Sequence, residues 1–375
     1  MPGEYYSCGV EFPLGEHLKS MSGPILLTGH TGFKGTWMTC LLESLKLQVV
    51  GYSLPAEEGS LFNRTARAGL IPETFADIRD YEALSKFIET HKPAAIIHLA
   101  AQPLVIKSYE SPRETFEVNV MGTANLMDIA SQHDFVKAVL VVTTDKVYRN
   151  QNTMRSFVES DPLEGKDPYS ASKVATESVV TAWQHISKVS KGPRIASVRA
   201  GNVIGGGDFA ENRIIPDLIR GILDSEVTKI RNPGSTRPWQ HVLDPLWGYF
   251  LALSALVENR QIQSINLAPK GESKTVFEVA LMAKSVWDEI NFEIQDIGES
   301  YSRSNELESL ELHLNAKLAE ELLGWEPEFS QDDAVASSIN WWRSLLTSNV
   351  NASELIFMEV SEFLQKKCNK YLKFM

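Results

Sequence analysis

The chain has 375 residues, a length typical of two domains or of one large domain with an additional lobe. Its 36 basic and 48 acidic residues give a formal charge of −12, which argues against a nucleic-acid-binding protein and against docking on anionic lipid. The hydrophobic fraction of 43% and the charged fraction of 22% are typical of a folded globular protein and exclude a largely disordered one.

Cysteines, histidines and apolar runs restrict the class further. Cys8, Cys40 and Cys368 show no Cys-x-x-Cys spacing, so we expect no disulfide framework and a reducing, cytoplasmic location. No histidine pair has metal-ligand spacing, and no metal is expected. The apolar run 246–257 is too short to span a bilayer and predicts a buried helix. Residues 1–23 read as an N-terminal extension without the pattern of a secretory signal.

From Pro24 onward, short apolar runs rich in β-branched residues alternate with amphipathic helical patterns. Such runs are typical of buried parallel strands, and strict β–α alternation indicates right-handed crossovers. We therefore predict an α/β protein with a Rossmann-like, doubly wound parallel sheet. The predicted strands are 25–29, 49–53, 74–78, 94–100, 138–144 and 195–202, and the predicted helices between them are 32–46, 79–91, 112–132 and 168–189.

The rhythm changes after Asn202. A glycine-rich loop and short strand-and-turn pieces, 264–271 among them, lie between five helical patterns and predict a smaller mixed α/β C-terminal lobe. The predicted domains are the Rossmann-like domain over 24–202, the substrate lobe over 203–347, interleaved with it, and a tail helix over 348–375. The five helices of the lobe are expected at 213–224, 243–258, 275–289, 315–323 and 331–347.

A glycine-rich loop follows the first predicted strand and leads directly into a helix. Gly29 would permit the tight turn, Gly32 would let a pyrophosphate approach the backbone, and Gly35 would let the helix pack closely on the sheet. A purely structural turn is the alternative. In this context the pattern predicts a dinucleotide site whose loop also contains Thr31, Phe33 and Lys34.

The ends of the next two strands bear on the cofactor. Gly51-Tyr52-Ser53 contains neither the acid that selects NAD nor the basic cluster that accepts a 2′-phosphate, so these residues alone do not choose between NAD and NADP. Asp77 could accept a hydrogen bond from an adenine amino group. Alternatively, it caps the helix expected to begin near Arg79.

The DPYSASK segment (167–173) predicts a catalytic helix. Asp167 is its candidate N-cap and Pro168 its first residue, and Tyr169 and Lys173 share one face because they are four residues apart. A neighbouring lysine should lower the pKa of the phenol, so that Tyr169 can take a hydroxyl proton during hydride transfer. The alternative is an ordinary solvated helix face.

Thr144, Asp145 and Lys146 follow the fifth predicted strand, whose carboxyl end should face the ligand crevice. The hydroxyl could orient a reacting hydroxyl group beside Tyr169, while the adjacent acid and amine could move further protons. A surface ion pair in a loop is the alternative.

Taken together, these motifs resemble the extended short-chain dehydrogenase/reductases and, within them, the CDP-glucose 4,6-dehydratases. The resemblance extends from about residue 24 to 327. It is carried by GHTGFKGTW (29–37), HLAAQPLV (98–105), TTDKVY (143–148), DPYSASK (167–173), RAGNVIGGGDFA (199–210), RIIPD (213–217) and RNPGSTRPWQHVLDPL (231–246). Phe209 departs from the tryptophan expected after GGGD, and Val147 and Arg149 also depart from the pattern.

The resemblance implies an intramolecular redox cycle with NAD as cofactor. Tyr169 would take the 4-hydroxyl proton with Thr144 as its hydroxyl partner, Asp145 would protonate the departing 6-hydroxyl, and NADH would return its hydride to C6. Lys146 stands where dTDP-glucose enzymes have a glutamate base. It can remove the C5 proton only when neutral, and a charged Asp145 opposes this.

The resemblance also implies further contacts. Asn119 would support the catalytic lysine. Asn202, Arg237 and, less specifically, Arg213 would hold the diphosphate of a nucleotide-sugar substrate. We expect Trp239 and His241 to pack within the lobe. Further expected contacts are Ile78, Leu99, Ala100 and Ala101 for the cofactor and Gln102 for the substrate; helices 112–132 and 168–189 would pair in a homodimer.

Three other functions remain open from the sequence. A UDP-N-acetylglucosamine 4,6-dehydratase also uses an Asp-Lys pair, but the RPWQHV and GNVIGGGD segments count against it. A 4-epimerase would leave Asp145 and Lys146 without a role. A non-catalytic dinucleotide sensor would be expected to have lost Tyr169 or Lys173, and both are present.

Overall fold

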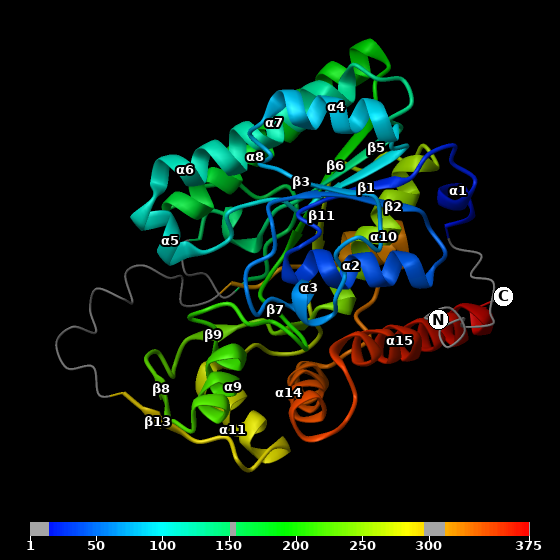
Figure 1. Cartoon of the computed structure of the whole chain (residues 1–375). Coiled ribbons are helices and arrows are strands. Elements are labelled where there is room, and N and C mark those ends of the chain that lie inside the picture. Colours follow the sequence, from blue (N-terminus) through cyan, green and yellow to red (C-terminus); the bar gives the residue numbers. More distant parts are fainter. Residues whose placement is uncertain (1–14, 151–154, 296–311, 375) are drawn as a thin grey trace.

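A seven-stranded parallel sheet forms the centre of the molecule. The computed structural model describes residues 15–150, 155–295 and 312–374. The strands follow the order β3-β2-β1-β4-β5-β6-β11, and each neighbouring pair is parallel (Figure 1), which confirms the predicted α/β, Rossmann-like class. The strands are β1 (Ile25–Thr28), β2 (Val49–Ser53), β3 (Glu73–Phe75), β4 (Ala95–His98), β5 (Ala138–Val142), β6 (Arg194–Ala200) and β11 (Ser264–Leu267).

The central strands are buried on both faces, as their continuous apolar runs predict. Successive side chains alternate between two cores: Leu26 and Ile96 lie in one, while Leu27 and Ile97 lie in the other. All four side chains are fully buried. This double burial fixes the register, because a slip of one residue would exchange the two faces.

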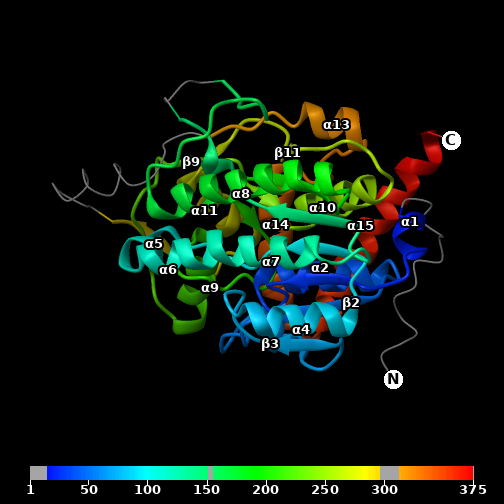
Figure 2. The same cartoon turned by 90° about the horizontal axis from the view of Figure 1, so that it is seen from above.

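Helices cover both faces of the sheet. One face carries α4 (Tyr81–His91), α7 (Gly122–Ser131) and α8 (Pro168–Ser190), which lie side by side in Figure 2. The other carries α2 (Phe33–Ser44) and α10 (Leu243–Val257). Residues 243–256 of α10 are all buried, which confirms the buried helix predicted from the apolar run.

The predicted helix over 112–132 is continuous in space but not uniform. It consists of α6 (Pro112–Phe116), a π-helical stretch η1 (Glu117–Met121) and α7. A π-helical stretch inserts an extra residue into the helical ladder and often occurs at functional sites. Asn119 lies in this stretch and is buried.

The lobe lies below the carboxyl half of the sheet in Figure 1 and contains three two-stranded pairs. Three elements expected in the lobe lie at the central sheet instead: β11 pairs with β6 and completes the sheet, α10 covers one of its faces, and α13 (Lys317–Leu323) packs against α10 and β11. The predicted domain boundaries stay predictions. The segment after Asn202 contains β7 (Val203–Ile204), α9 (Ile214–Asp224), β8 (Thr228–Ile230), β9 (Thr236–Arg237), β10 (Gln240–His241), β12 (Lys274–Thr275), α11 (Val276–Val286), β13 (Phe292–Ile294) and α14 (Gln331–Thr347), besides α10, β11 and α13.

The C-terminal segment forms the single helix predicted for it, α15 (Ala352–Phe374). It packs against α2 and α14, and its apolar face, which includes Ile356, Val360, Phe363 and Leu364, joins the same core as α2 and α10. Within the described residues, no helix combines the length and the apolar character needed to cross a membrane. The remaining short helices are α1 (Glu16–Lys19), α3 (Leu61–Arg64), α5 (Val105–Glu110) and the 3-10 turn η2 (Asp145–Val147).

Candidate active site

The three loop glycines have different steric environments. A Cβ on Gly29, whose φ is 74°, would lie 2.7 Å from the backbone nitrogen of Ala100, and one on Gly35 would lie 2.1 Å from the Gly29 carbonyl oxygen. Both positions therefore require glycine for close backbone packing. A Cβ on Gly32, the N-cap of α2, would meet a single atom, at 3.4 Å. Space thus remains at the amino end of α2, where backbone N–H groups favour an anion.

Lys34, in the first turn of α2, points toward the centre of the site. Its Nζ donates a hydrogen bond to the Tyr249 hydroxyl at 3.3 Å. Desolvation, reinforced by the positive charges of Arg213 and Lys173, lowers the pKa of Lys34 to about 7. The sequence indicated no role for Tyr249, because α10 is apolar along its whole length and lies more than two hundred residues away.

The other loop residues are held by neighbouring strands. The Thr31 hydroxyl hydrogen-bonds the Ser53 hydroxyl at 2.7 Å and donates to the Leu54 carbonyl oxygen at 3.0 Å. His30 is fully buried, and its Nε2 lies 2.7 Å from a Glu73 carboxylate oxygen. A Cβ on Gly51 would lie 2.7 Å from the His30 ring, so the imidazole occupies the space above the second strand. Phe33 is half-buried beside Gly205.

Asp77 is engaged by its near neighbour Arg79. The guanidinium donates three hydrogen bonds to the two carboxylate oxygens, and the Arg79 backbone N–H donates a fourth. The side-chain hydrogen bond from Arg79 holds the pKa of Asp77 below its usual value. The alternative role of Asp77, as the cap of the next helix, is wrong: α4 begins at Tyr81 and is capped by Asp80, which accepts from the backbone N–H of Ala83.

Asn119 organises the loop after β4. Its Oδ1 accepts from the backbone N–H of Gln102 at 2.8 Å, and its Nδ2 donates to the Gln102 carbonyl and to the Ser172 hydroxyl. The structure therefore connects Asn119 with α8 through Ser172, the residue before Lys173. The Gln102 amide in turn bonds Leu104 and Thr115, so its polar atoms hold the loop.

The apolar residues expected to contact the cofactor lie at the end of β4 and beside α7. Leu99, Ala100 and Ala101 are half-buried at the carboxyl end of β4, and Ile78 is buried beneath Gly122.

Tyr169 and Lys173 lie buried on one face of α8. Asp167 caps this helix together with Ser170, and Pro168 is its first residue, as predicted. The Lys173 Nζ donates to the Val142 carbonyl oxygen at 3.2 Å, and desolvation lowers its pKa to about 8. Desolvation raises the pKa of Tyr169 to about 12, with Thr144 opposing this rise. The expected lowering of the phenol pKa by the lysine is not found, because burial dominates.

Thr144, Asp145, Lys146 and Asn202 form one hydrogen-bonded group at the carboxyl ends of β5 and β6. The Thr144 hydroxyl donates to Asp145 Oδ1 at 3.0 Å. The Lys146 Nζ donates to the same oxygen at 3.4 Å and to Asn202 Oδ1 at 3.3 Å. Asp145 is 1% exposed, whereas the Lys146 side chain is 23% exposed, so the carboxyl group is buried and the amine reaches the open side of the site.

Two arginines predicted to bind substrate lie at different depths. Arg213 donates to the buried Asp208 at 2.8 Å, and its charge acts on both Tyr169 and Lys34, which places it at the rim of the same site. Arg237 is buried in β9 and donates to the Thr236 carbonyl oxygen. The charge of Arg213 thus reaches Tyr169, while Arg237 lies on a lobe strand.

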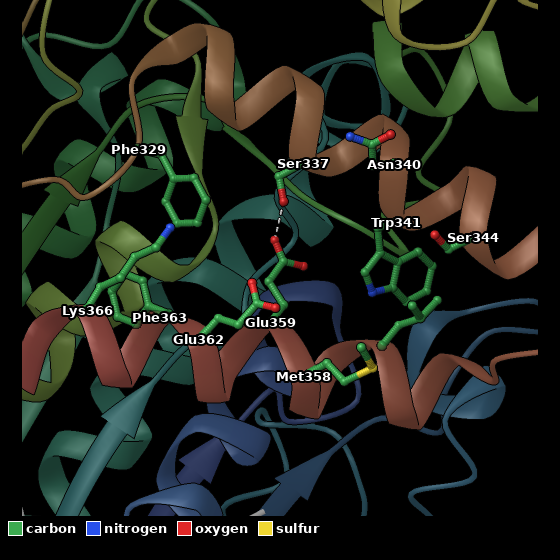
Figure 3. A pocket seen from close by; sticks show the side chains of 11 residues that line it. Phe329, Ser337, Asn340, Trp341, Ser344, Met358, Glu359, Glu362, Phe363 and Lys366 are labelled. Atoms are coloured by element: carbon green, nitrogen blue, oxygen red, sulfur yellow. Dashed lines mark hydrogen bonds between the residues drawn. The ribbon is translucent and has the colours of Figure 1, made fainter. Parts of the chain in front are cut away.

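Trp239 and His241 pack within the lobe, as expected. The Trp239 indole donates to the Lys274 carbonyl oxygen. His241 is fully buried and stacks on Phe329, but it also reaches beyond the predicted lobe: its ring meets Trp37 of α2 edge-on, and its Nε2 lies 3.0 Å from a Glu359 oxygen of the tail helix. Glu359 also borders a cavity of about 250 Å³ between α14 and α15 (Figure 3), well apart from Tyr169 in sequence and fold.

Sequence reasoning missed the groups behind the catalytic helix. Glu177 and Arg199 form a buried ion pair at 2.9 Å, and Thr143 donates to the same carboxylate. One signal was available: Glu177 follows Lys173 by four residues, so it lies on the same buried face of α8.

Comparisons with known proteins show the family to which the chain belongs. The model of the NAD dependent epimerase/dehydratase family matches residues 25–268. The CDP-glucose 4,6-dehydratase of Salmonella typhimurium is 38% identical to this chain over 329 residues, which cover 85% of this chain and 90% of that protein. The UDP-glucose 4-epimerase of Halalkalibacterium halodurans is 28% identical over 336 residues, covering 84% and 95%.

A solved structure gives the same fold. DesIV, a dTDP-glucose 4,6-dehydratase from Streptomyces venezuelae with NAD and TYD bound, superposes with a TM-score of 0.72 at 24% identity. The match covers 86% of this chain and 97% of that one. From the family match, the sequence identity and the arrangement of the sheet and its loops, the chain belongs to the NAD dependent epimerase/dehydratase family.

Proposed function

We propose that this protein is a sugar-nucleotide 4,6-dehydratase that converts CDP-glucose to CDP-4-keto-6-deoxyglucose. One observation carries the proposal: Asp145 and Lys146 lie beside Thr144 at the strand end that faces Tyr169. An epimerase needs a tyrosine, a lysine and a hydroxyl group. The additional acid and amine are the groups that a water elimination requires. The identity of 38% to a CDP-glucose 4,6-dehydratase supports the same reaction and the same nucleotide.

The residues around Gly32 fit NAD. Gly32 leaves room for a pyrophosphate at the amino end of α2, while Gly29 and Gly35 hold the loop close to the sheet. We assign the remaining cofactor contacts to the loop after β4 and to the region of Ile78. Bound there, NAD would supply the hydride chemistry of the reaction, as acceptor for the oxidation at C4 and as donor for the reduction at C6.

The side chains of this chain move the protons. Tyr169 takes the proton of the 4-hydroxyl, and Thr144 orients that hydroxyl. The ammonium form of Lys173 favours the tyrosinate. Once C4 is a ketone, the C5 proton is acidic, Lys146 removes it, and Asp145 gives its proton to the departing 6-hydroxyl. Loss of the C5–H and C6–O bonds releases one water. Lys146 then gives its proton back to C5 as C6 is reduced, and the proton that Tyr169 took leaves to solvent, from which Asp145 is reprotonated.

Lys146 and Asp145, the proposed base and acid, share one contact. Asp145 must be protonated to act as an acid, and in that form it no longer opposes a neutral amine beside it. The acceptor atom that both Thr144 and Lys146 contact is Asp145 Oδ1, so one carboxyl group connects the two proton transfers.

Mass spectrometry of the product tests the function. The purified protein is incubated with NAD and, separately, with CDP-glucose, dTDP-glucose and UDP-N-acetylglucosamine. We expect the loss of one water from CDP-glucose without net NADH. Loss of water from UDP-N-acetylglucosamine alone would replace the proposal with the alternative dehydratase, and a product of unchanged mass that elutes as an isomer would indicate a 4-epimerase. Absence of turnover with all three would favour the sensor.

We also propose a homodimer formed by helices 112–132 and 168–189. Support comes from exposed apolar side chains on these helices, Phe116, Met121, Ile186 and Val189, since such residues on adjacent helices suit a helical interface. Light scattering should give twice the chain mass. The cytoplasmic location stays a proposal, which cell fractionation can test.

A further inference from the structure

A buried carboxylate lies one helical turn behind the catalytic lysine. Glu177 follows Lys173 on the buried face of α8 and is 4% exposed. It accepts hydrogen bonds from Thr143, from Ser197 at 2.8 Å, and twice from Arg199 at 2.9 Å. Both carboxylate oxygens are therefore engaged by groups on the neighbouring sheet.

Arg199 extends these contacts across the sheet. Beyond its two bonds to Glu177, the guanidinium donates to the Tyr148 hydroxyl at 2.7 Å and to the Glu159 carbonyl oxygen at 3.1 Å. The Tyr148 hydroxyl donates onward to Asn266 in β11 at 2.7 Å. The planar, permanently charged guanidinium suits such a fixed set of acceptors.

The partners of Glu177 stand next to the reacting groups. Thr143 immediately precedes the Thr144-Asp145-Lys146 turn, and Arg199 lies three residues before Asn202. One carboxylate on α8 thus holds the ends of β5 and β6, while the preceding turn of the same helix presents Lys173. A shift of α8 relative to the ends of β5 and β6 would move Tyr169 away from Asp145 and Lys146. Small misplacements of this kind slow catalysis strongly.

A gain in folding stability is a weak explanation for the presence of the Glu177–Arg199 pair. Replacing a buried ion pair by apolar groups is often neutral or stabilising, because burial of two charges is costly. The pair is nevertheless ionised: against the desolvation of both groups, hydrogen bonding and charge from Glu177 raise the pKa of Arg199, and those from Arg199 lower the pKa of Glu177.

The negative charge of Glu177 also acts on the pKa of Lys173. The groups that face the amine are Lys34 from α2, His98 from β4 and Glu177 from its own helix. Desolvation lowers the pKa of Lys173, and the negative charge of Glu177 opposes this effect. Burial lowers the pKa of Lys34 to about 7 and that of His98 to about 3, so neither group carries a full positive charge near pH 8, and Glu177 is the charge that supports the ammonium form of Lys173.

We propose that Glu177 is a positioning residue for the reaction: through Thr143 and Arg199 it holds the ends of β5 and β6 against the helix of Tyr169 and Lys173. It also keeps Lys173 in the ammonium form that the phenol requires. This inference rests on the proposed function for its kinetic readout.

The decisive variant is Glu177→Gln, which keeps the size of the side chain and removes its charge. We expect kcat for CDP-glucose to fall at least about tenfold with KM changed less than about threefold. Because Lys173 loses its nearest negative charge, the basic limb of the pH profile of kcat/KM should move to lower pH by about one unit.

Ser197→Ala is the matched control. It removes one neutral hydrogen bond to the same carboxylate and leaves the charge in place, so it should reduce thermal stability without moving the basic limb. If Glu177→Gln does not fold, the double variant Glu177→Gln with Arg199→Met removes both charges and should show the same shift. A basic limb unmoved in the folded Glu177 variants, or moved equally by Ser197→Ala, would overturn the inference.

A second readout needs no substrate. Competitive labelling of amines with acetic anhydride, followed by peptide mass spectrometry, gives the titration of Lys173 in the holoenzyme. A lower midpoint in Glu177→Gln than in the wild type and in Ser197→Ala would support the inference even if the wild type failed to dehydrate CDP-glucose. In that case the proposed function alone would fail. Equal midpoints would reject the inference whatever the substrate.

Discussion

The Nζ atom of Lys146 lies 3.4 Å from Oδ1 of Asp145, so the two groups proposed to carry the protons of the elimination are in contact within one turn of chain. Although they are in contact, their roles can be tested separately, because either side chain can be substituted while the other and the Tyr169–Lys173 pair remain.

Asp145→Asn should stop the elimination after the first oxidation. The amide keeps the size of the side chain but cannot give a proton to the 6-hydroxyl. We expect single-turnover absorbance to show reduced cofactor that accumulates, with water loss slowed by about 10²–10⁴-fold. Unchanged water loss in this variant would remove Asp145 from the mechanism.

Lys146→Met should suppress exchange of the C5 proton with solvent deuterium while C4 oxidation continues. The methionine keeps the length of the side chain and has no basic nitrogen. Lys86→Met, on the exposed face of α4, is the control for the loss of one positive charge. Mass spectrometry of the recovered sugar measures the incorporation of deuterium at C5. Incorporation at the wild-type rate would show that another residue is the base.

Lys34→Met should change how stability depends on pH. The folded chain holds the Lys34 pKa at about 7, whereas its ordinary value is 10.5. Between these values the unfolded chain binds the proton and the folded one does not, so stability rises with pH across this interval. The variant should therefore melt higher than the wild type near pH 6, and the difference should shrink toward pH 10. A constant difference in melting temperature would show that Lys34 titrates normally.

Glycine substitutions in the loop should separate folding from cofactor binding. Gly35→Ala places a methyl group 2.1 Å from a backbone oxygen and should lower the free energy of unfolding by about 1–3 kcal/mol. Gly32→Ala, with a single neighbour at 3.4 Å, should melt near the wild type yet bind NAD more weakly. Calorimetric titration with NAD and thermal melts measure both. Equal NAD affinity in Gly32→Ala and the wild type would place the pyrophosphate elsewhere.

Local pattern predicted the elements of the fold well, since buried strands and capped helices are encoded over short stretches. The six strands, the cap of α8 and the tail helix all follow from neighbouring residues. The position of β11 does not: its four residues are equally suited to the lobe, and pairing with β6 depends on contacts made far along the chain.

The candidate site divides in the same way. Tyr169, Lys173 and the Thr144–Lys146 turn could be found because strand ends and helical spacing place them. The contact between Lys34 and Tyr249 joins residues 215 positions apart, and the pairing of Asp77 with Arg79 is one of several local choices for a carboxylate. Tertiary packing decides the first contact, and a choice among equivalent local partners decides the second; neither leaves a clear trace in a single sequence.

The return of the chain to the sheet at β11 has a consequence for anyone who wishes to isolate the dinucleotide-binding half. A fragment ending at residue 202 would leave β6 with an unpaired edge and would strip α10 from one face of the sheet. An exposed edge flanked by bare apolar surface invites association between chains. Such a fragment should be recovered as aggregate, and the smallest piece that can be purified as a monodisperse species should extend at least through Leu267.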